Sequence, residues 1–234
     1  ISNVTGALFT VIEKRLPGGV YVVSASRVTG EPVIEVFQGL GVAKLHTDGI
    51  FHSPNSGAIY KIQENKIFES SLLKDLSERI KNTGLLPYLS GFYLQDQIID
   101  RLEDAFAKTS IESVENDPRN LTNHYHMGKR IFIVRARGSG TVPLSWRKQI
   151  ETLSQKNNVI IIITTSADSG DVNLRKYEAG LDFEGVISDR TLREEAVLSL
   201  AAISYDLKIN EKFTNQNIQK LINRYCYLSG MIED

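Results

Sequence analysis

The sequence predicts an α/β fold, and three features of the chain support that prediction. Apolar stretches of strand length alternate with amphipathic stretches of helical length, above all in the second half. The most apolar stretch, Val159–Ile163, is a continuous run of Val and Ile, which is typical of a parallel strand covered by helices on both faces. Clusters of Gly, Pro, Ser and Asn separate the stretches. Together these features predict a doubly wound parallel sheet, with ligands expected at the carboxyl ends of its strands.

Composition narrows the class of protein. The chain has 234 residues, of which 41% are hydrophobic and 24% charged, and this suits one large or two small globular domains. Its formal net charge of -1, without a long block of one sign, indicates neither nucleic acid nor an anionic membrane as a partner. No apolar run reaches the length that spans a membrane, and no signal peptide is visible. Cys226 is the only cysteine, which excludes an internal disulfide framework and fits a reducing, cytoplasmic compartment.

The first region predicts a helix followed by short strands. Apolar spacing predicts a helix over Val4–Lys14. Residues Gly19–Ser26 and Pro32–Phe37 are rich in strand-forming side chains and predict two strands joined by a Gly-containing turn. The loop Ser53–Gly57 then precedes a short strand over Ala58–Ile62.

Residues from about 63 to 83 are charged and polar, with a weak helical period, and are interpreted as the connection between two lobes. The expected domain boundaries are therefore 1–66 for what the chain holds of the first α/β lobe, 67–84 for the linker and 85–234 for the second α/β lobe.

The second region predicts strands and helices in turn, as in a small flavodoxin-like lobe. The expected elements, in chain order, are a strand at Leu85–Leu94, a helix at Gln95–Lys108, a polar surface excursion at Thr109–Met127, a strand at Arg130–Ala136, a helix at Leu144–Gln155, strands at Val159–Thr165 and Val186–Ser188, a helix from Thr191 to about Tyr205, and a helix at Phe213–Tyr227.

The turn Gly138–Thr141 joins a predicted strand to a predicted helix, where phosphate-binding loops are found. A phosphate loop needs a Gly-Lys-Ser/Thr ending, which is absent, and a dinucleotide fingerprint needs a third glycine where this chain has Pro143. On pattern alone, a structural connection whose glycines allow unusual backbone angles is favoured over a binding loop.

Other polar residues in the second region have ordinary explanations. His124 and His126 have the spacing of two metal ligands on one side of a strand, but no third ligand is assignable nearby, and an exposed loop pair is favoured. Arg135 and Arg137 are expected to form a buried ion pair between lobes or subunits, in preference to binding substrate. Trp146 is expected to be a packing residue.

Several short motifs, taken in order along the chain, resemble one family. They are Lys44-Leu45-His46-Thr47, the stretch FHSPNSG from Phe51 to Gly57, the stretch GSGTVP from Gly138 to Pro143, Thr164-Thr165-Ser166, Gly170-Asp171-Val172-Asn173 with Tyr177 and Gly180, and Gly185-Val186-Ile187-Ser188 with Glu194-Glu195-Ala196. This ordered set is similar to bacterial-type L-asparaginases and to the related amidase subunit of archaeal glutamyl-tRNA amidotransferase. The resemblance covers most of the chain and implies a partial N-terminal lobe followed by a smaller C-terminal lobe.

The resemblance implies amide hydrolysis by a threonine nucleophile. The family holds that residue in a Thr-Gly-Gly-Thr-Ile motif, which does not occur in the 234 residues, and has a Thr-Asp pair and a lysine further along; aligned by the motifs above, Ile1 falls just after that Thr-Asp pair. Without an activated hydroxyl and its proton acceptor, an amide carbon has no attacking group. Because the chain begins at Ile1 and not at Met, we expect the nucleophile in a preceding segment, and no activity from this chain alone on L-asparagine or a related side-chain amide. The alternative is a noncatalytic asparaginase-like module for binding or assembly.

By the same resemblance, the Gly138–Thr141 turn lies near the active site of a neighbouring subunit. This implies a homodimer or tetramer, a small amide or amino-acid ligand, no cofactor and no metal. Ser139, Thr141 and Asp171 are the expected contacts to the substrate or partner site. Relatives often have Asn where this chain has Thr141, and one hydroxyl does not reproduce the donor and acceptor of an amide. The alternatives are that Thr141 caps the next helix and that Asp168 and Asp171 are ordinary turn residues.

Overall fold

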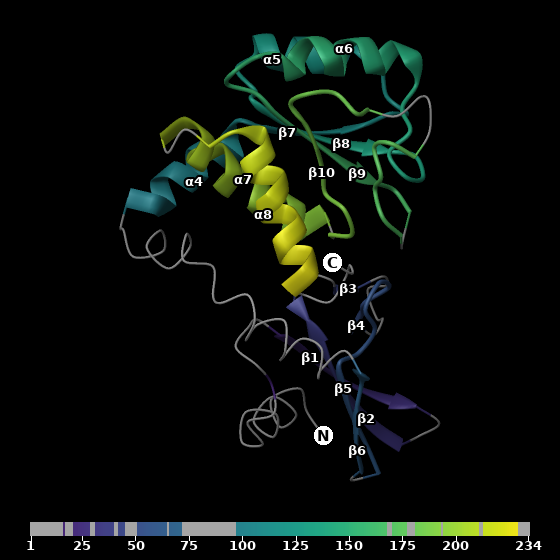
Figure 1. Ribbon diagram of the computed structural model, residues 1–234. Coiled ribbons are helices and arrows are strands. Elements are labelled where there is room, and N and C mark those ends of the chain that lie inside the picture. Colours follow the sequence, from purple (N-terminus) through teal and green to yellow (C-terminus); the bar gives the residue numbers. More distant parts are fainter. Residues whose placement is uncertain are drawn as a thin grey trace. The chain divides into compact units, whose positions relative to one another are not determined.

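The computed structural model describes residues 16, 21–28, 31–39, 42–44, 51–64, 66–71, 97–167, 170–176, 181–192, 194–210 and 213–228. The chain divides into two compact units, one made of residues 1–86 and 225–234 and the other of residues 87–224. Each unit contains its own four-stranded sheet, and these two sheets are of different kinds (Figure 1).

The first unit is built on a four-stranded antiparallel sheet in the order β1-β2-β5-β6. Strands β1 (Tyr21–Val28) and β2 (Glu31–Gln38) pair along their whole length, and β2 also pairs with β5 (Tyr60–Gln63). Val36, Ile59 and Tyr60 form the centre of its core, and each is at most 1% exposed. The β-branched and aromatic side chains along β1, β2 and β5 explain why these strands were predictable.

One prediction in the first unit was wrong. Residues Lys66–Glu69 form strand β6, which pairs with β5, whereas the sequence pattern indicated a connection with a weak helical period. Three of the four side chains of β6 are exposed, so the strand lacks the apolar alternation that identifies a half-buried strand. Two further short strands, β3 (Ala43–Lys44) and β4 (Phe51–His52), pair with each other.

The second unit contains a four-stranded parallel sheet in the order β10-β9-β8-β7. The predicted strands are present as β8 (Ile131–Ala136), β9 (Ile160–Thr165) and β10 (Val186–Ser188). Residues 131–134 of β8 and 160–163 of β9 are fully buried, as expected of strands that are covered on both faces.

Strand β7 (Thr109–Ser113) was not predicted, because the stretch around it was interpreted as a polar surface excursion. Its inward-facing side chains are polar: Ser110 and Glu112 are buried, while Ile111 is exposed. The apolar-in, polar-out pattern on which strand prediction depends is therefore inverted in β7. The same excursion also contains helix α5 (Arg119–His126).

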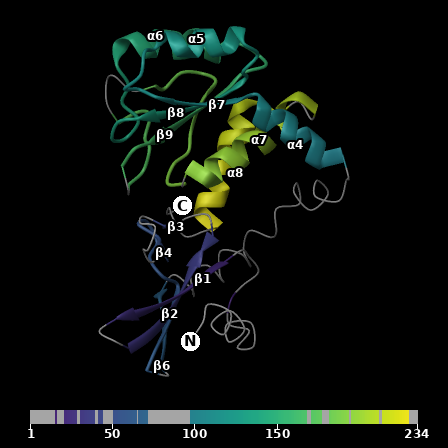
Figure 2. The same ribbon diagram turned by 180° about the vertical axis from the view of Figure 1, so that it is seen from behind.

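Helices cover both faces of the parallel sheet, which confirms the predicted α/β fold class (Figure 1). Helices α5 and α6 (Leu144–Ser154) pack on one face over Phe132, Val134, Ile161 and Ile163. Helices α4 (Gln97–Ala107) and α7 (Glu194–Asn210) pack together on the other side, and α7 contacts β8 and β9 (Figure 2).

Helix α8 (Asn215–Leu228) completes the described helices, and it runs beside β10. Trp146 on α6 is 1% exposed, which confirms its predicted packing role, and Cys226 on α8 is buried. The helix predicted at Val4–Lys14 and the strand predicted at Leu85–Leu94 lie outside the described residues. Within the described part of the chain, none of the helices combines the length and apolar character needed to cross a membrane.

Candidate functional site at the carboxyl edge of the parallel sheet

The carboxyl ends of β8, β9 and β10 meet at one edge of the parallel sheet. Ala136 is paired with Thr165, and Ser188 with Ile163, so the segments that follow these strands start side by side. Open α/β sheets bind ligands outside this edge. The predicted site residues Ser139 and Thr141 follow β8, and Asp171 lies in the loop between β9 and β10.

The turn after β8 is held by its own backbone. The N–H of Arg137 donates to the carbonyl oxygen of Thr141 at 3.0 Å, and the N–H of Thr141 donates back to the carbonyl of Arg137 at 2.9 Å. Gly138 and Gly140 have φ angles of 51° and 103°, in the left-handed region that favours glycine. This geometry is that of the predicted βα connection.

Gly140 also meets a space requirement. A Cβ atom at this position would lie 3.1 Å from a methyl group of Val172 and 3.2 Å from one of Leu174. The backbone N–H of Asn173 donates to the carbonyl oxygen of Ser139 at 3.1 Å. The turn after β8 is thus packed directly against residues 172–174, and glycine permits that approach.

Asp171 and Ser139, which are distant in sequence, each lie beside a cation, and the charge of Lys176 also acts on Asp171. The guanidinium of Arg190 lies 3.2 Å from Oδ2 of Asp171, and Nζ of Lys176 donates to Oγ of Ser139 at 3.4 Å. Burial raises the pKa of the Asp171 carboxyl, and the charges of Arg190 and Lys176 partly offset that rise. We call Ser139, Asp171, Lys176 and Arg190 the edge cluster.

Two atoms of the edge cluster are available for a further interaction. Oδ1 of Asp171 and Nε of Arg190 are buried, and neither has a hydrogen-bond partner within the described part of the chain. Buried polar groups are nearly always hydrogen-bonded, so an acceptor and a donor left this way point to a ligand, a water molecule or a partner.

Thr141 contributes to the turn after β8 through its backbone hydrogen bonds with Arg137. Helix α6 begins at Leu144 with Pro143 in the N-cap position, so the alternative that Thr141 caps this helix is wrong. Thr141 is half-buried beside Ser139, and its role as a site contact stays a prediction.

The residues Asp189 and Arg190, directly after β10, were missed in the sequence. Asp189 is 1% exposed, and burial raises the pKa of its carboxyl well above the usual range; a hydrogen bond with Thr164 partly offsets the rise, while the nearby charge of Asp171 adds to it. Arg190 has a φ angle of 62°, which is uncommon for a residue other than glycine. Strongly shifted carboxyls and left-handed backbone both concentrate at functional sites.

The sequence did contain an indication that Asp189 and Arg190 belong to the site. They follow the predicted strand Val186–Ser188 without a gap, and the rule that ligands bind at carboxyl ends applies to β10 as it does to β8. What the sequence lacked was any indication that Asp189 is buried, because Asp is usually exposed.

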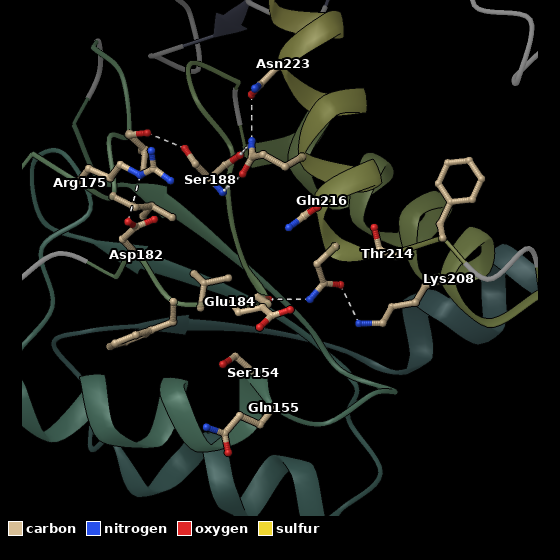
Figure 3. A pocket seen from close by; sticks show the side chains of 18 of the residues that line it. Ser154, Gln155, Arg175, Asp182, Glu184, Ser188, Lys208, Thr214, Gln216 and Asn223 are labelled. Carbon is tan, nitrogen blue, oxygen red and sulfur yellow. Dashed lines mark hydrogen bonds and ion pairs between the residues drawn. The ribbon is translucent and has the colours of Figure 1, made fainter.

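A pocket of about 1330 Å³ opens beside β10 in the second unit (Figure 3). Arg190 and Ser188 line it, together with an ion pair between Arg175 and Asp182 at 3.0 Å. Burial lowers the pKa of Lys208, another lining residue. Carboxamide side chains are frequent in its wall: Gln155, Asn157, Asn173, Asn215, Gln216, Gln219 and Asn223. The pocket is therefore polar and suited to a hydrogen-bonding ligand.

Other predicted constellations lie elsewhere in the second unit. His124 and His126 are on helix α5 and not on a loop or strand, and Nδ1 of His124 lies 2.5 Å from the buried carboxylate of Glu112. No group of three metal-binding side chains occurs among the residues that the structure describes. Asp168 is outside them.

The ion pairs that the two arginines form within the described residues are exposed, and a buried pair with another subunit stays a prediction. Arg135 binds Glu194 of α7 through an exposed ion pair within the same unit. Arg137 lies 3.8 Å from Glu115, and both side chains are exposed.

Comparisons with known proteins agree with this fold. No family model matches the chain. In sequence, the chain is 26% identical over 218 residues to a glutamyl-tRNA(Gln) amidotransferase subunit of Methanococcus maripaludis, with 88% of this chain and 48% of the relative covered. In structure, it matches the thermostable L-asparaginase from Thermococcus kodakarensis with a TM-score of 0.64 at 17% identity, over 99% of this chain and 62% of that chain. L-asparaginase I from Vibrio cholerae matches with a TM-score of 0.55 at 19% identity, over 80% of this chain and 52% of that chain.

The chain thus spans about half the length of the curated relative that it matches. At these identities the solved structures establish the fold, and the sequence match points to the same group of proteins. The resemblance to asparaginase-like proteins that the ordered motifs predicted is confirmed.

Proposed function

We propose that this asparaginase-like chain is part of an amidohydrolase of the L-asparaginase type, which converts L-asparagine or a related side-chain amide to the acid and ammonia. In this proposal the edge cluster contributes contacts to the substrate, and a segment preceding Ile1 contributes the nucleophile. The observation that carries the proposal is the pair of unsatisfied buried atoms, Oδ1 of Asp171 and Nε of Arg190, beside the Ser139 turn.

The charges of the edge cluster suit an amino acid. A free amino acid has a cationic ammonium and an anionic carboxylate on one carbon, so a binding site needs an acceptor and a donor close together. Asp171 offers the acceptor, and Arg190 and Lys176 offer charged donors, which form stronger hydrogen bonds than neutral ones. Ser139 adds a hydroxyl within reach of Lys176.

The chemistry itself requires groups beyond the edge cluster. A hydroxyl oxygen attacks the amide carbon, the carbon–nitrogen bond breaks, and the nitrogen leaves as ammonia after it takes up a proton; water then releases the acid from the enzyme. Within the described residues the edge cluster holds no hydroxyl paired with a proton acceptor in that manner, so its proposed part is binding and orientation.

We further propose a homodimer or tetramer in a reducing, cytoplasmic compartment. The support for assembly is that Ser139 and Thr141 lie on an edge whose buried donor and acceptor are unsatisfied within the described part of the chain. A second copy that places its own catalytic groups against this edge would complete the site.

The alternative function is a noncatalytic binding or assembly module of the same fold. Thr141 favours it, because relatives often have an Asn at this place and a hydroxyl does not reproduce an amide's hydrogen bonds. The coding sequence upstream of Ile1 separates the two: a Thr-Gly-Gly-Thr motif supports the enzyme, and its absence supports the module.

The direct test is binding of L-asparagine and L-glutamine to the 234-residue chain by calorimetry, together with ammonia release. We expect binding without release. Asp171→Asn should weaken binding at least about tenfold, since it removes a charged partner of the ligand. Asp104→Asn, an exposed carboxyl on α4 that is paired with Lys108 and does not line the pocket, is the matched control and should bind as the native chain does. Equal affinity of both variants, or no binding by a folded chain, contradicts the assignment.

A further inference from the structure

We propose that Gln219 on α8 is a positioning residue, whose carboxamide fixes, through Ser188, the two segments that carry Asp171 and Arg190. The inference rests on the proposed function only for what the edge cluster binds. The hydrogen-bond coupling between α8 and the edge cluster stands on the geometry alone.

The first link joins Gln219 to the backbone of β10. Oε1 of Gln219 accepts a hydrogen bond from the N–H of Ser188 at 2.7 Å, and Nε2 donates to the carbonyl oxygen of Ser188 at 2.9 Å. One carboxamide therefore satisfies both backbone groups that Ser188 directs away from β9. This is the pairing that the backbone of a neighbouring strand would supply.

The orientation of that carboxamide is fixed. Nε2 of Gln219 also donates to Oδ1 of Asn223, one turn further along α8, at 2.9 Å (Figure 3). An exchange of oxygen and nitrogen in the Gln219 side chain would place a donor against the N–H of Ser188 and an acceptor against its carbonyl. Only one orientation satisfies all three bonds.

The second link joins Ser188 to the edge cluster. Its hydroxyl donates to the carbonyl oxygen of Val172 at 2.5 Å and accepts from the backbone N–H of Arg190 at 3.0 Å. The N–H of Val172 in turn donates to the carbonyl of Arg190 at 2.9 Å. Val172 is next to Asp171, so these three bonds hold together the backbone segments that carry the carboxylate and the guanidinium.

A second amide of α8 strengthens the attachment. Nδ2 of Asn215 donates to the carbonyl oxygen of Gly185, just before β10, at 2.8 Å, and Oδ1 of Asn215 accepts from Nζ of Lys208 at 2.7 Å. Asn215, Gln219 and Asn223 are spaced by four residues and share one face of the helix. Helix α8 thus holds β10 at both of its ends.

These hydrogen bonds stabilise the left-handed backbone of Arg190. A left-handed backbone in a residue other than glycine persists when surrounding contacts over-determine it. Arg190 has that conformation, and its N–H and carbonyl are both bonded to the Ser188–Val172 junction. Loss of the Gln219 contacts would let the 189–190 turn relax, and the Asp171–Arg190 pair would loosen.

The test compares Gln219→Leu with Gln216→Leu in the same helix. Gln216 is exposed and lines the same pocket, so it controls for a lost carboxamide on α8. The readout is amide hydrogen exchange at Val172 and Arg190, measured by NMR without any ligand. We expect Gln219→Leu to speed exchange at both amides by about five- to thirtyfold, the effect of losing one or two hydrogen bonds, and Gln216→Leu to leave it unchanged.

Gln219→Glu gives a second arm in case the Leu variant does not fold. It keeps the acceptor for the N–H of Ser188 and loses both donated bonds, so it should give an intermediate increase in exchange. Unchanged exchange at Val172 and Arg190 in a folded Gln219 variant overturns the proposal, even if Ser188 itself exchanges faster, because Gln219 would then only cover the edge of β10.

Ligand binding separates this inference from the proposed function. If L-asparagine binds, Gln219→Leu should weaken that binding; Gln216→Leu, which changes the lining of the same pocket, is the control for the exchange measurement only. If L-asparagine does not bind while exchange at Val172 and Arg190 still responds to Gln219, the proposed function fails and the positioning role stands.

Discussion

Two turns at the carboxyl edge of the parallel sheet both contain left-handed backbone, but different residues adopt and stabilise it. The turn after β8 reaches left-handed backbone with Gly138 and Gly140 and closes through its own backbone hydrogen bonds. The turn after β10 reaches it with Arg190, a residue that prefers other conformations, and depends on the side chain of Ser188. The first is a simple connection, and the second holds charge and strain in place. The charged pair to which the proposed function assigns binding thus includes a residue of the turn that local rules disfavour.

The largest expected effect on the free energy of unfolding is at the turn after β8, which contains Gly138 and Gly140. Gly140→Ala places a Cβ at left-handed φ and within 3.2 Å of Val172 and Leu174, so we expect it to lower the free energy of unfolding by about 2 to 4 kcal/mol. Gly138→Ala is the matched control, because nothing lies within 4 Å of the added atom, and it should cost about 1 to 2 kcal/mol. Urea denaturation measures both. Equal losses would mean that the close approach of the 172–174 segment contributes nothing.

The turn after β10 should be destabilised by loss of the Ser188 hydroxyl. Ser188→Ala removes the bonds to the Val172 carbonyl and the Arg190 N–H, and we expect a loss of about 1 to 3 kcal/mol in urea denaturation because both backbone groups lose a buried partner. Ser154→Ala is a comparable buried serine away from the edge cluster, whose hydroxyl bonds only within its own helix. It should cost less than Ser188→Ala, and the reverse order would contradict the role given to Ser188.

The turn after β10 also contains Asp189, whose protonation should make the stability of the protein depend on pH. The folded protein raises the pKa of the Asp189 carboxyl above its value in the unfolded chain, so between those two values the folded state binds more protons. Stability from Asp189 is therefore complete below the unfolded pKa and declines as pH rises from there toward the folded pKa. Asp189→Asn should remove this decline and be relatively more stable at neutral pH than at acidic pH. Parallel pH profiles of unfolding for both proteins would show that Asp189 is not the group responsible.

The smallest effect on stability is expected at Arg137, at the start of the turn after β8. Arg137→Gln removes an exposed pair with Glu115 and should change stability by less than about 0.5 kcal/mol in thermal unfolding. What the pair does contribute should decrease at high salt, because exposed charges are screened. A larger loss would mean that Arg137 has a partner in solution, such as a second copy of the chain.

Sequence reasoning succeeded where local periodicity and burial agree. The continuous Val and Ile run of β9 and the amphipathic pattern of α6 were both predictable, because their buried side chains are apolar. It failed at β7 and β6, where buried positions are polar or most positions are exposed. Two members of the edge cluster, Ser139 and Asp171, were predicted from the resemblance. Lys176 and Arg190 were not, although Arg190 follows closely after the predicted strand Val186–Ser188, at the edge where ligands are expected.

By itself, the sequence determined the alternation of strands and helices, the glycines required at the turn after β8, and the ordered motifs that identify asparaginase-like proteins, since each of these depends on residues close together in the chain. The tertiary structure decided which distant residues meet. Pairing of Ser188 with Ile163 and contact of Gln219 with Ser188 bring Asp171, Arg190 and Ser139 to one edge and bury Asp189. Burial and the resulting change in pKa follow from long-range packing, and a linear pattern of residue types does not contain that information.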